Sequence, residues 1–392
     1  MMNYDLLVPA RTVFGWGRLD ELGALARTQG TKAFVISGSR QFAVNGTLRR
    51  IDELLAAAGV ESVQVGSIHH EPCIDDVDEM TISIRRQLTA ESLVIGIGGG
   101  AALDLAKAVS ATAANPHLDS VKDALEGVGK GLTLEQPPLP VLAVPTTSGT
   151  GSEATKNAVI SSSPGDDQPF KKSLRADLMV PKAVLIDPEL SVSVPADVTA
   201  RTGMDAITQL IESWISCRAK PVTSALARHG LELAIPMIER AVEDGSDREA
   251  REAMAHAAYL SGICLANAGL GMAHGVAPAL GILLGVPHGL ACAVMLPAAI
   301  AANCQVRKTE IAKVGRLFSG DRDLSDTEAA AGCADLVRAL NERLGLPSGL
   351  SVLGLTAALI PAVVKGSRGN SMNGNPRPIE NDELTAILES ML

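Results

Sequence analysis

Short apolar segments recur through the first half of the chain and stop near Pro188. They are rich in β-branched residues, and stretches with helical periodicity separate them. Strands that alternate with helices in this way form a parallel sheet whose two faces the helices cover. The pattern predicts strands at residues 32–37, 62–68, 92–98, 139–145 and 182–187.

The second half of the chain carries a different pattern. Apolar residues recur there at spacings of three and four, and Pro, Gly and Asp separate the successive segments, which is typical of helices. The expected helices cover residues 201–216, 221–243, 248–268 and 327–344. We therefore expect an α/β, Rossmann-like domain over residues 1–195 and an all-α domain over residues 196–392.

Composition narrows the class of protein. The formal net charge of −10 argues against a nucleic-acid or anionic-membrane partner, because both need a basic face. No stretch has the roughly 20 apolar residues of a membrane span, and the N-terminus lacks a basic and apolar signal pattern. The six cysteines form no C-x-x-C pair, which fits a reducing compartment. We expect a cytoplasmic protein that acts on a small molecule.

A glycine-rich turn follows the third predicted strand. Gly98, Gly99 and Gly100 stand between that strand and the Ala-rich start of a helix. Glycines let backbone N–H groups approach a pyrophosphate closely, and the helix N-terminus adds positive potential. The turn suits a dinucleotide site, and a simple strand-to-helix connection fits the same residues equally well.

A second polar loop, residues 144–155, follows the fourth predicted strand. It concentrates hydroxyls and glycines, including Thr146, Thr147, Ser148 and Thr150. Such groups suit hydrogen bonds to a cofactor phosphate, ribose or carboxamide. The alternative is a loop whose hydroxyls satisfy its own backbone.

Two segments of the helical half carry candidate metal ligands. Asp205 and Gln209 are four residues apart on an amphipathic helix and so project from one face. Alternatively, Thr202 to Asp205 is a capping box and the other polar groups are solvated.

His274 and His288 lie in a nearly uncharged apolar run, residues 268–297. A shared divalent metal would satisfy both buried imidazoles. Taken singly, each histidine is better explained as a hydrogen-bonded core residue.

Together these segments resemble the iron-containing (group III) alcohol dehydrogenase family, almost from end to end. The blocks that carry the likeness are PARTVFGWGRLDEL at 9–22, GGGAALDLAK at 98–107, PTTSGTGSE at 145–153, IDPEL at 186–190, TGMDAITQLIESWIS at 202–216, MAHGVA to PHG at 272–289, and GNPRPI at 374–379.

The resemblance implies an N-terminal dinucleotide-binding domain and a C-terminal helical domain, with cofactor and metal meeting between them. It also implies a homodimer. It implies hydride transfer between a nicotinamide and a small alcohol or carbonyl compound. The cofactor contacts that it implies are Gly98, Gly99, Gly100, Ala101, Asp104, Thr146, Thr147 and Lys171, with Lys172 as an alternative to Lys171.

The family's metal ligands are an Asp and three His, and by the resemblance they fall on Asp205, Gln209, His274 and His288. Asp205, His274 and His288 would also be the catalytic groups, around iron or zinc acting as a Lewis acid. Glutamine in place of one histidine is a neutral oxygen donor, which weakens affinity for those metals and favours harder cations. Pro278 replaces a further histidine of many relatives, so no proton relay is assigned.

Cofactor preference follows from the end of the first predicted strand. Many NAD-using relatives carry an acidic residue there, whereas this chain has Gly38, Ser39 and Arg40. Loss of the carboxylate and gain of a guanidinium suit a 2′-phosphate, so we expect NADP to be preferred over NAD.

Three other functions fit the same residues. A metal-independent enzyme similar to maleylacetate reductase would explain Gln209. A lyase similar to dehydroquinate synthase would need a basic cluster, and the helical half has few basic residues near the expected site. A catalytically silent nucleotide-binding protein would not require both histidines.

Overall fold

The computed structural model of the chain describes residues 3–38, 42 and 44–392. Two compact units make up the chain. The sheet unit consists of Leu7–Thr147 and Ser152–Ser191, and the helical unit consists of Ser148–Gly151, Val192–Leu392 and the described residues up to Leu6. A single domain boundary between residues 195 and 196 stays a prediction.

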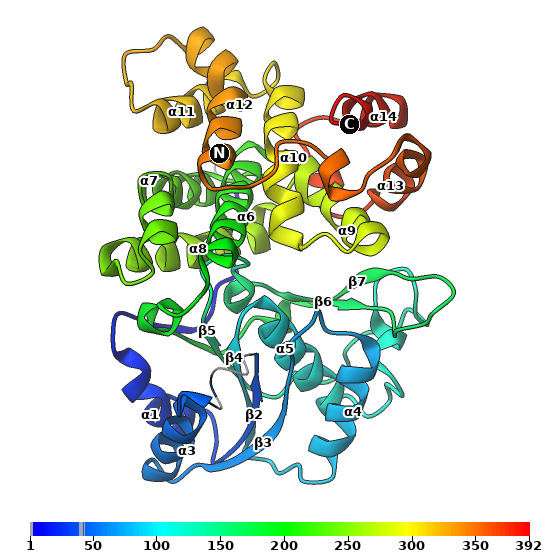
Figure 1. Cartoon of the computed structure of the whole chain (residues 1–392). Coiled ribbons are helices and arrows are strands. Elements are labelled where there is room, and N and C mark those ends of the chain that lie inside the picture. The colour runs from blue at the N-terminus through cyan, green and yellow to red at the C-terminus, as the bar shows by residue number, and fades with distance from the viewer. Residues whose placement is uncertain (1–2, 39–41, 43) are drawn as a thin grey trace. The chain divides into compact units, whose positions relative to one another are not determined.

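A parallel sheet of six strands, in the order β1-β8-β5-β4-β2-β3, is the centre of the sheet unit (Figure 1). All five predicted strands are present, and the unpredicted β1 pairs with β8 at one edge. The strands are β1 (Arg11–Phe14), β2 (Lys32–Ser37), β3 (Glu61–Ser67), β4 (Ser92–Gly98), β5 (Val141–Pro145) and β8 (Ala183–Ile186).

Helices cover both faces of this sheet, as the alternation of strands and helices predicts. Phe34 and Ile36 pack in the core under α4 and α5, whereas Val35, between them, packs on the other side with residues of α1 and α3. Successive residues of a strand point to opposite faces, so each strand contributes to both cores. The helices are α1 (Leu22–Arg27), α3 (Thr47–Ala57), α4 (Ile74–Arg85) and α5 (Gly100–Ala114), with short 3-10 turns η1 (Arg18–Glu21), η2 (Val121–Ala124), η3 (Ser152–Ala154), η4 (Asp177–Met179) and η5 (Pro188–Ser191).

A small antiparallel sheet also belongs to this unit. Strands β6 (Asn157–Ser161) and β7 (Lys171–Arg175) pair in register from Asn157 opposite Arg175 to Ser161 opposite Lys171. Both strands are short, and their polar and apolar residues do not alternate strictly, so the pattern of apolar segments does not predict them.

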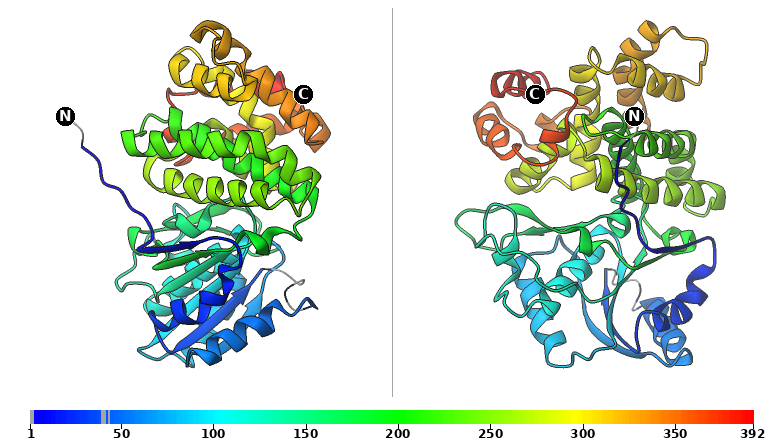
Figure 2. Two further views of the ribbon diagram at one scale, coloured as in Figure 1. Left: turned by 90° about the vertical axis from the view of Figure 1, so that its left-hand side faces the viewer. Right: turned by 180° about the vertical axis from the view of Figure 1, so that it is seen from behind.

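The helical unit contains no strand among its described residues. Helices α6, α7 and α8 pack side by side (Figure 2), and α9 and α10 share a core with α13 and α14. The helices are α6 (Ala196–Ile215), α7 (Pro221–Glu243), α8 (Arg248–Ala268), α9 (Met272–Leu284), α10 (His288–Asn303), α11 (Lys308–Ser319), α12 (Asp326–Arg343), α13 (Ile360–Gly366) and α14 (Asn381–Glu389), with 3-10 turns η6 (Ser351–Leu353), η7 (Ala357–Leu359) and η8 (Met372–Gly374). The predicted helical architecture of the second half is confirmed.

Helix α6 begins earlier than the sequence pattern indicates. It starts at Ala196, directly after Pro195, so Thr202 lies inside the helix. The Thr202 hydroxyl donates to the Val198 carbonyl at 2.9 Å. A capping box from Thr202 to Asp205 is therefore wrong.

Across the described residues, no single helix has both the length and the apolarity to cross a membrane. By those two criteria alone the pair α8 and α9 could, although the two helices are bent by 101° relative to each other.

Candidate functional site

Four side chains from three helices converge in the helical unit. Asp205 comes from α6, His274 from α9, and His288 and Cys292 from α10, and their ligand atoms all lie within 4.8 Å of one another. The Asp205 Oδ1 atom is 3.2 Å from His274 Nε2 and 4.0 Å from His288 Nε2. We call these four residues the metal cluster, because carboxylate, imidazole and thiol are the donors that divalent zinc and iron accept.

Glu212 fixes the orientation of His274. Its carboxylate lies 2.8 Å from His274 Nδ1 and also accepts the backbone N–H groups of Ala273 at 2.6 Å and His274 at 3.3 Å. With Nδ1–H donated to Glu212, the Nε2 atom faces Asp205 and can present its lone pair. A carboxylate behind a ligating histidine is a frequent partner of metal sites.

The buried charges of the cluster influence one another. Burial opposes ionisation of Asp205, but the hydrogen bond with His274 and the charge of His288 lower its pKa. Burial would also lower the pKa of His274, yet Cys292, Asp205 and Glu212 raise it well above its usual value. The cluster therefore favours positive charge at its centre, which a divalent cation supplies and a protonated His274 supplies without one.

Gln209 lies one helical turn after Asp205, as predicted, and is 3 % exposed. The Ser261 hydroxyl is 2.9 Å from the Gln209 Oε1 atom, so a buried serine holds this amide. Asp205 and Glu212 are each 1 % exposed. The alternative in which this face of α6 is solvated is wrong.

Two residues of the site were not predicted from the sequence. Cys292 stands in an apolar run that resembles a core segment, although it follows His288 by four residues on the same helix face. Glu212 follows Asp205 by seven residues, which also places both on one face. Helical spacing from a suspected ligand is the signal that could have found them.

The glycine turn of the sheet unit lies at the carboxyl ends of β2, β4 and β5. Gly98 ends β4 with φ +150°, Gly99 precedes α5, and Gly100 and Ala101 are the first residues of that helix. A Cβ atom at Gly98 would lie 2.9 Å from Gly38 Cα and 2.8 Å from Ala102 Cβ. The turn thus needs glycine for a close backbone approach, and it leaves the α5 N-terminus suited to an anion.

Thr146 and Thr147 border this turn. The Thr146 N–H group donates to the Gly98 carbonyl at 3.0 Å, and a Cβ at Gly99 would lie 3.3 Å from Thr147 Oγ1. Gly38 donates its N–H to the Ile97 carbonyl at 2.8 Å. The predicted residues at these positions are therefore brought together, whereas Ser39 and Arg40 lie outside the described residues.

Asp104 and Lys171 bind protein partners in this structure. The Asp104 carboxylate accepts the Ser152 hydroxyl and, at 2.9 Å, the Val159 N–H group. The Lys171 ammonium lies 2.6 Å from the Glu71 carboxylate. Their predicted contacts with the cofactor stay predictions.

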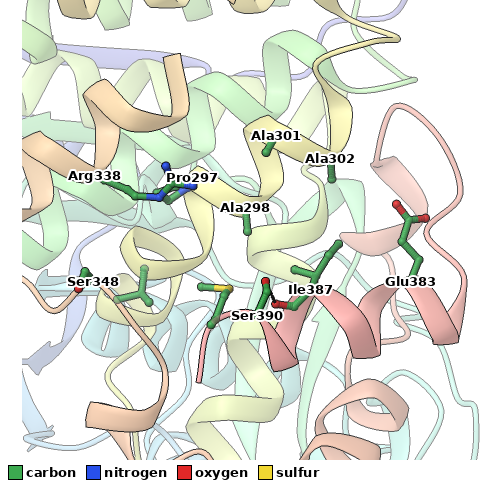
Figure 3. A pocket seen from close by; sticks show the side chains of 11 residues that line it. Pro297, Ala298, Ala301, Ala302, Arg338, Ser348, Glu383, Ile387 and Ser390 are labelled. Atoms are coloured by element: carbon green, nitrogen blue, oxygen red, sulfur yellow. Dashed lines mark hydrogen bonds between the residues drawn. The ribbon is translucent and has the colours of Figure 1, made fainter. Parts of the chain in front are cut away.

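A pocket of about 300 Å³ opens elsewhere in the helical unit (Figure 3). Its walls come from α10, α12 and α14, including Ala298, Arg338 and Glu383. Neither histidine of the metal cluster lines it, so this pocket is separate from the candidate metal site.

Comparisons with known proteins agree over both halves of the chain. The family described as iron-containing alcohol dehydrogenase matches residues 9–188, and the C-terminal region of the Fe-containing alcohol dehydrogenase family matches residues 199–392. Long-chain-alcohol dehydrogenase 1 of Geobacillus thermodenitrificans is 31% identical, over 98% of this chain and 96% of its own length. NAD-dependent methanol dehydrogenase of Bacillus methanolicus is 30% identical, over 99% of this chain and 100% of its own. The solved structure of a 1,3-propanediol oxidoreductase superposes with a TM-score of 0.90 at 29% identity, covering 100% of both chains.

Proposed function

We propose that Asp205, His274 and His288 hold the divalent metal of this chain, which belongs to the iron-containing alcohol dehydrogenase family. As a member of that family, the chain is an oxidoreductase that interconverts an alcohol with an aldehyde or ketone. One observation carries the proposal. Asp205 and His274 face each other at 3.2 Å from two helices, while Glu212 holds the far side of the His274 ring.

Each residue has a definite task in this proposal. When bound, the nicotinamide exchanges the hydride and the divalent metal polarises the substrate oxygen. Asp205 supplies a negative charge that burial leaves unscreened by water, and His274 and His288 add neutral nitrogen donors. The Gly98 turn anchors the cofactor pyrophosphate through backbone N–H groups.

The decisive experiment combines metal analysis of the purified protein with a panel of small alcohols and aldehydes and both nicotinamides. We expect a substrate-dependent change at the nicotinamide absorbance band that chelation abolishes and added metal restores. Activity unchanged by exhaustive chelation would favour the metal-independent alternative instead. Product formation without net nicotinamide turnover would favour the lyase.

NADP preference is a separate part of the proposal. A Cβ at Gly38 would meet Ala102 Cβ at 2.8 Å, so the end of β2 has no room for the carboxylate that repels a 2′-phosphate. We expect higher kcat/KM with NADP than with NAD. The double variant Gly38→Asp, Ala102→Gly makes room for a carboxylate and should reverse the order; equal or better efficiency of the unaltered protein with NAD would refute the preference.

We also propose that the enzyme acts as a cytoplasmic homodimer. Light scattering on the purified protein should give twice the chain mass of 40.6 kDa. A mass equal to that of one chain would refute the dimer.

A further inference from the structure

Cys292 is the one member of the metal cluster that the resemblance did not imply. It lies on α10 one turn after His288 and is 0 % exposed. Its Sγ atom is 3.7 Å from His288 Nε2 and within 4.8 Å of the Asp205 and His274 ligand atoms. A sulfur donor therefore faces the same centre as the three other side chains.

The separations within the cluster fit a tetrahedral site. With metal bonds of about 2.0–2.3 Å, neighbouring donors of a tetrahedron are about 3.3–3.8 Å apart. The donor atoms are 3.2 Å apart for Asp205–His274, 3.7 Å for His288–Cys292 and 4.0 Å for Asp205–His288. The other donor pairs also lie within 4.8 Å, so all four donors face one centre.

Gln209 is the weaker candidate for the fourth position. It is a neutral amide, and its oxygen already lies 2.9 Å from the Ser261 hydroxyl. A thiolate carries a full negative charge and is a soft donor that zinc accepts readily. With Cys292 present, a cation finds four donors without any contribution from Gln209.

We propose that Cys292 coordinates the divalent metal as a thiolate, together with Asp205, His274 and His288, and that this sulfur biases the site toward zinc over ferrous iron. The proposal rests on the proposed metal-dependent function. When the metal–sulfur bond forms, the thiol S–H bond breaks and its proton leaves to the buffer, because a coordinating thiol is deprotonated. No electron is transferred in this step.

The test uses the full-length protein, stripped of metal and reloaded with cobalt(II), which reports sulfur ligation by a sulfur-to-cobalt charge-transfer band in the near ultraviolet. We expect the band in the unaltered protein and its loss in Cys292→Ala and Cys292→Ser. Cys333→Ala is the matched control, since Cys333 is equally buried in the same unit and should leave the band intact. Circular dichroism of each variant confirms folding, and the serine variant retains the size of the side chain.

Competition between the two metals gives a second readout. Most nitrogen and oxygen sites bind zinc more tightly than ferrous iron. The informative quantity is therefore the change, between variants, in the ratio of bound zinc to bound iron. Under anaerobic conditions we expect the zinc-to-iron ratio to fall about tenfold in Cys292→Ala, and zinc affinity to fall about 100-fold.

The outcomes separate this proposal from the proposed function. Cobalt that binds without the band, in a protein whose activity depends on metal, overturns the role of Cys292 and leaves the function standing. A band that persists in Cys292→Ala also overturns it. A protein that turns over substrate but binds no divalent metal contradicts both proposals.

Discussion

The two candidate sites of this molecule are built by different means. In the helical unit, buried side chains from α6, α9 and α10 supply the donors, and Glu212 orients one of them. In the sheet unit, backbone groups of a glycine turn form the site, and the absence of side chains at Gly38 and Gly98 is what allows it. A site made of side chains depends on the functional groups that those side chains carry. A site made of backbone depends on the absence of side-chain atoms that would block the close approach of backbone and ligand.

The difference has a direct consequence for mutagenesis. Replacing a donor in the metal cluster should reduce metal binding and activity while the fold stays nearly unchanged. Adding a single carbon atom at the glycine turn should disturb the fold and the cofactor while the metal stays bound. The expected effects below follow this contrast, from the largest to the smallest.

Asp205→Asn should have the largest effect, because it removes the charge of the cluster while keeping its size. Loss of Lewis-acid stabilisation worth several kcal/mol corresponds to a fall in kcat/KM of about 1,000-fold or more. Metal content by mass spectrometry should fall in parallel. Asp197→Asn on the same helix is the control, since its side chain is 72% exposed and paired with Arg201; a fully metallated, active Asp205→Asn enzyme would contradict the assignment.

Glu212→Gln should have the next largest effect. The carboxylate accepts three N–H groups, and an amide replaces one acceptor oxygen with a donor. We expect metal affinity to fall about 10- to 100-fold, as measured by competition with a chelating dye. The partly exposed Glu232, paired with Arg228, provides the control Glu232→Gln. Unchanged affinity would mean that Glu212 only packs against α9.

Gly98→Ala tests the other side of the comparison. The added Cβ would meet Gly38 Cα at 2.9 Å at a φ of +150°, so strain and overpacking should lower the free energy of unfolding by about 2–5 kcal/mol. We expect the KM for the nicotinamide to rise while bound metal stays constant. Gly332→Ala, where a Cβ meets nothing within 4 Å, should not destabilise the protein. Loss of metal in Gly98→Ala would break the contrast between the sites.

The buried carboxyl group of Glu153 tests the pH dependence of stability, away from the metal cluster. It is 3 % exposed in η3, and desolvation raises its pKa to about 7. The unfolded chain ionises this carboxyl at lower pH than the folded one, so its contribution to stability is complete below pH of about 4.5 and is lost as the pH rises to about 7. Glu153→Gln should reduce the loss of unfolding free energy between pH 4.5 and 8 by about 1–3 kcal/mol.

Urea unfolding at both pH values measures this effect. Glu126→Gln, at an exposed ion pair with Arg175, is the control and should follow the unaltered protein. Equal pH dependence in Glu153→Gln and the unaltered protein would show that this carboxyl ionises freely in the fold.

The fold was largely predictable because its signals are local. Strands such as 92–98 are fully buried and read as continuous apolar runs, and α7 and α8 begin and end where the pattern indicates. The short strands β1, β6 and β7 were not predicted, because four or five residues of mixed polarity carry no distinctive period.

The site was predictable only in part because its contacts are long-range. Asp205 and His274 are 69 residues apart, and no local pattern shows that they meet. The sequence around Cys292 is typical of a core helix, and the sequence around Glu212 is typical of a helix with one solvated face. Their roles depend on which helices pack together, and that packing becomes apparent only in three dimensions.

The central claim is that Asp205, His274 and His288 hold the metal of this oxidoreductase. The most direct measurement is a crystal structure of the active, metal-loaded protein with anomalous scattering recorded at the absorption edge of the bound metal. The account predicts an anomalous peak about 2.0–2.3 Å from an Asp205 carboxylate oxygen and a nitrogen of each histidine. A fully active protein whose peak lies among other side chains, or that has no peak at all, would contradict it.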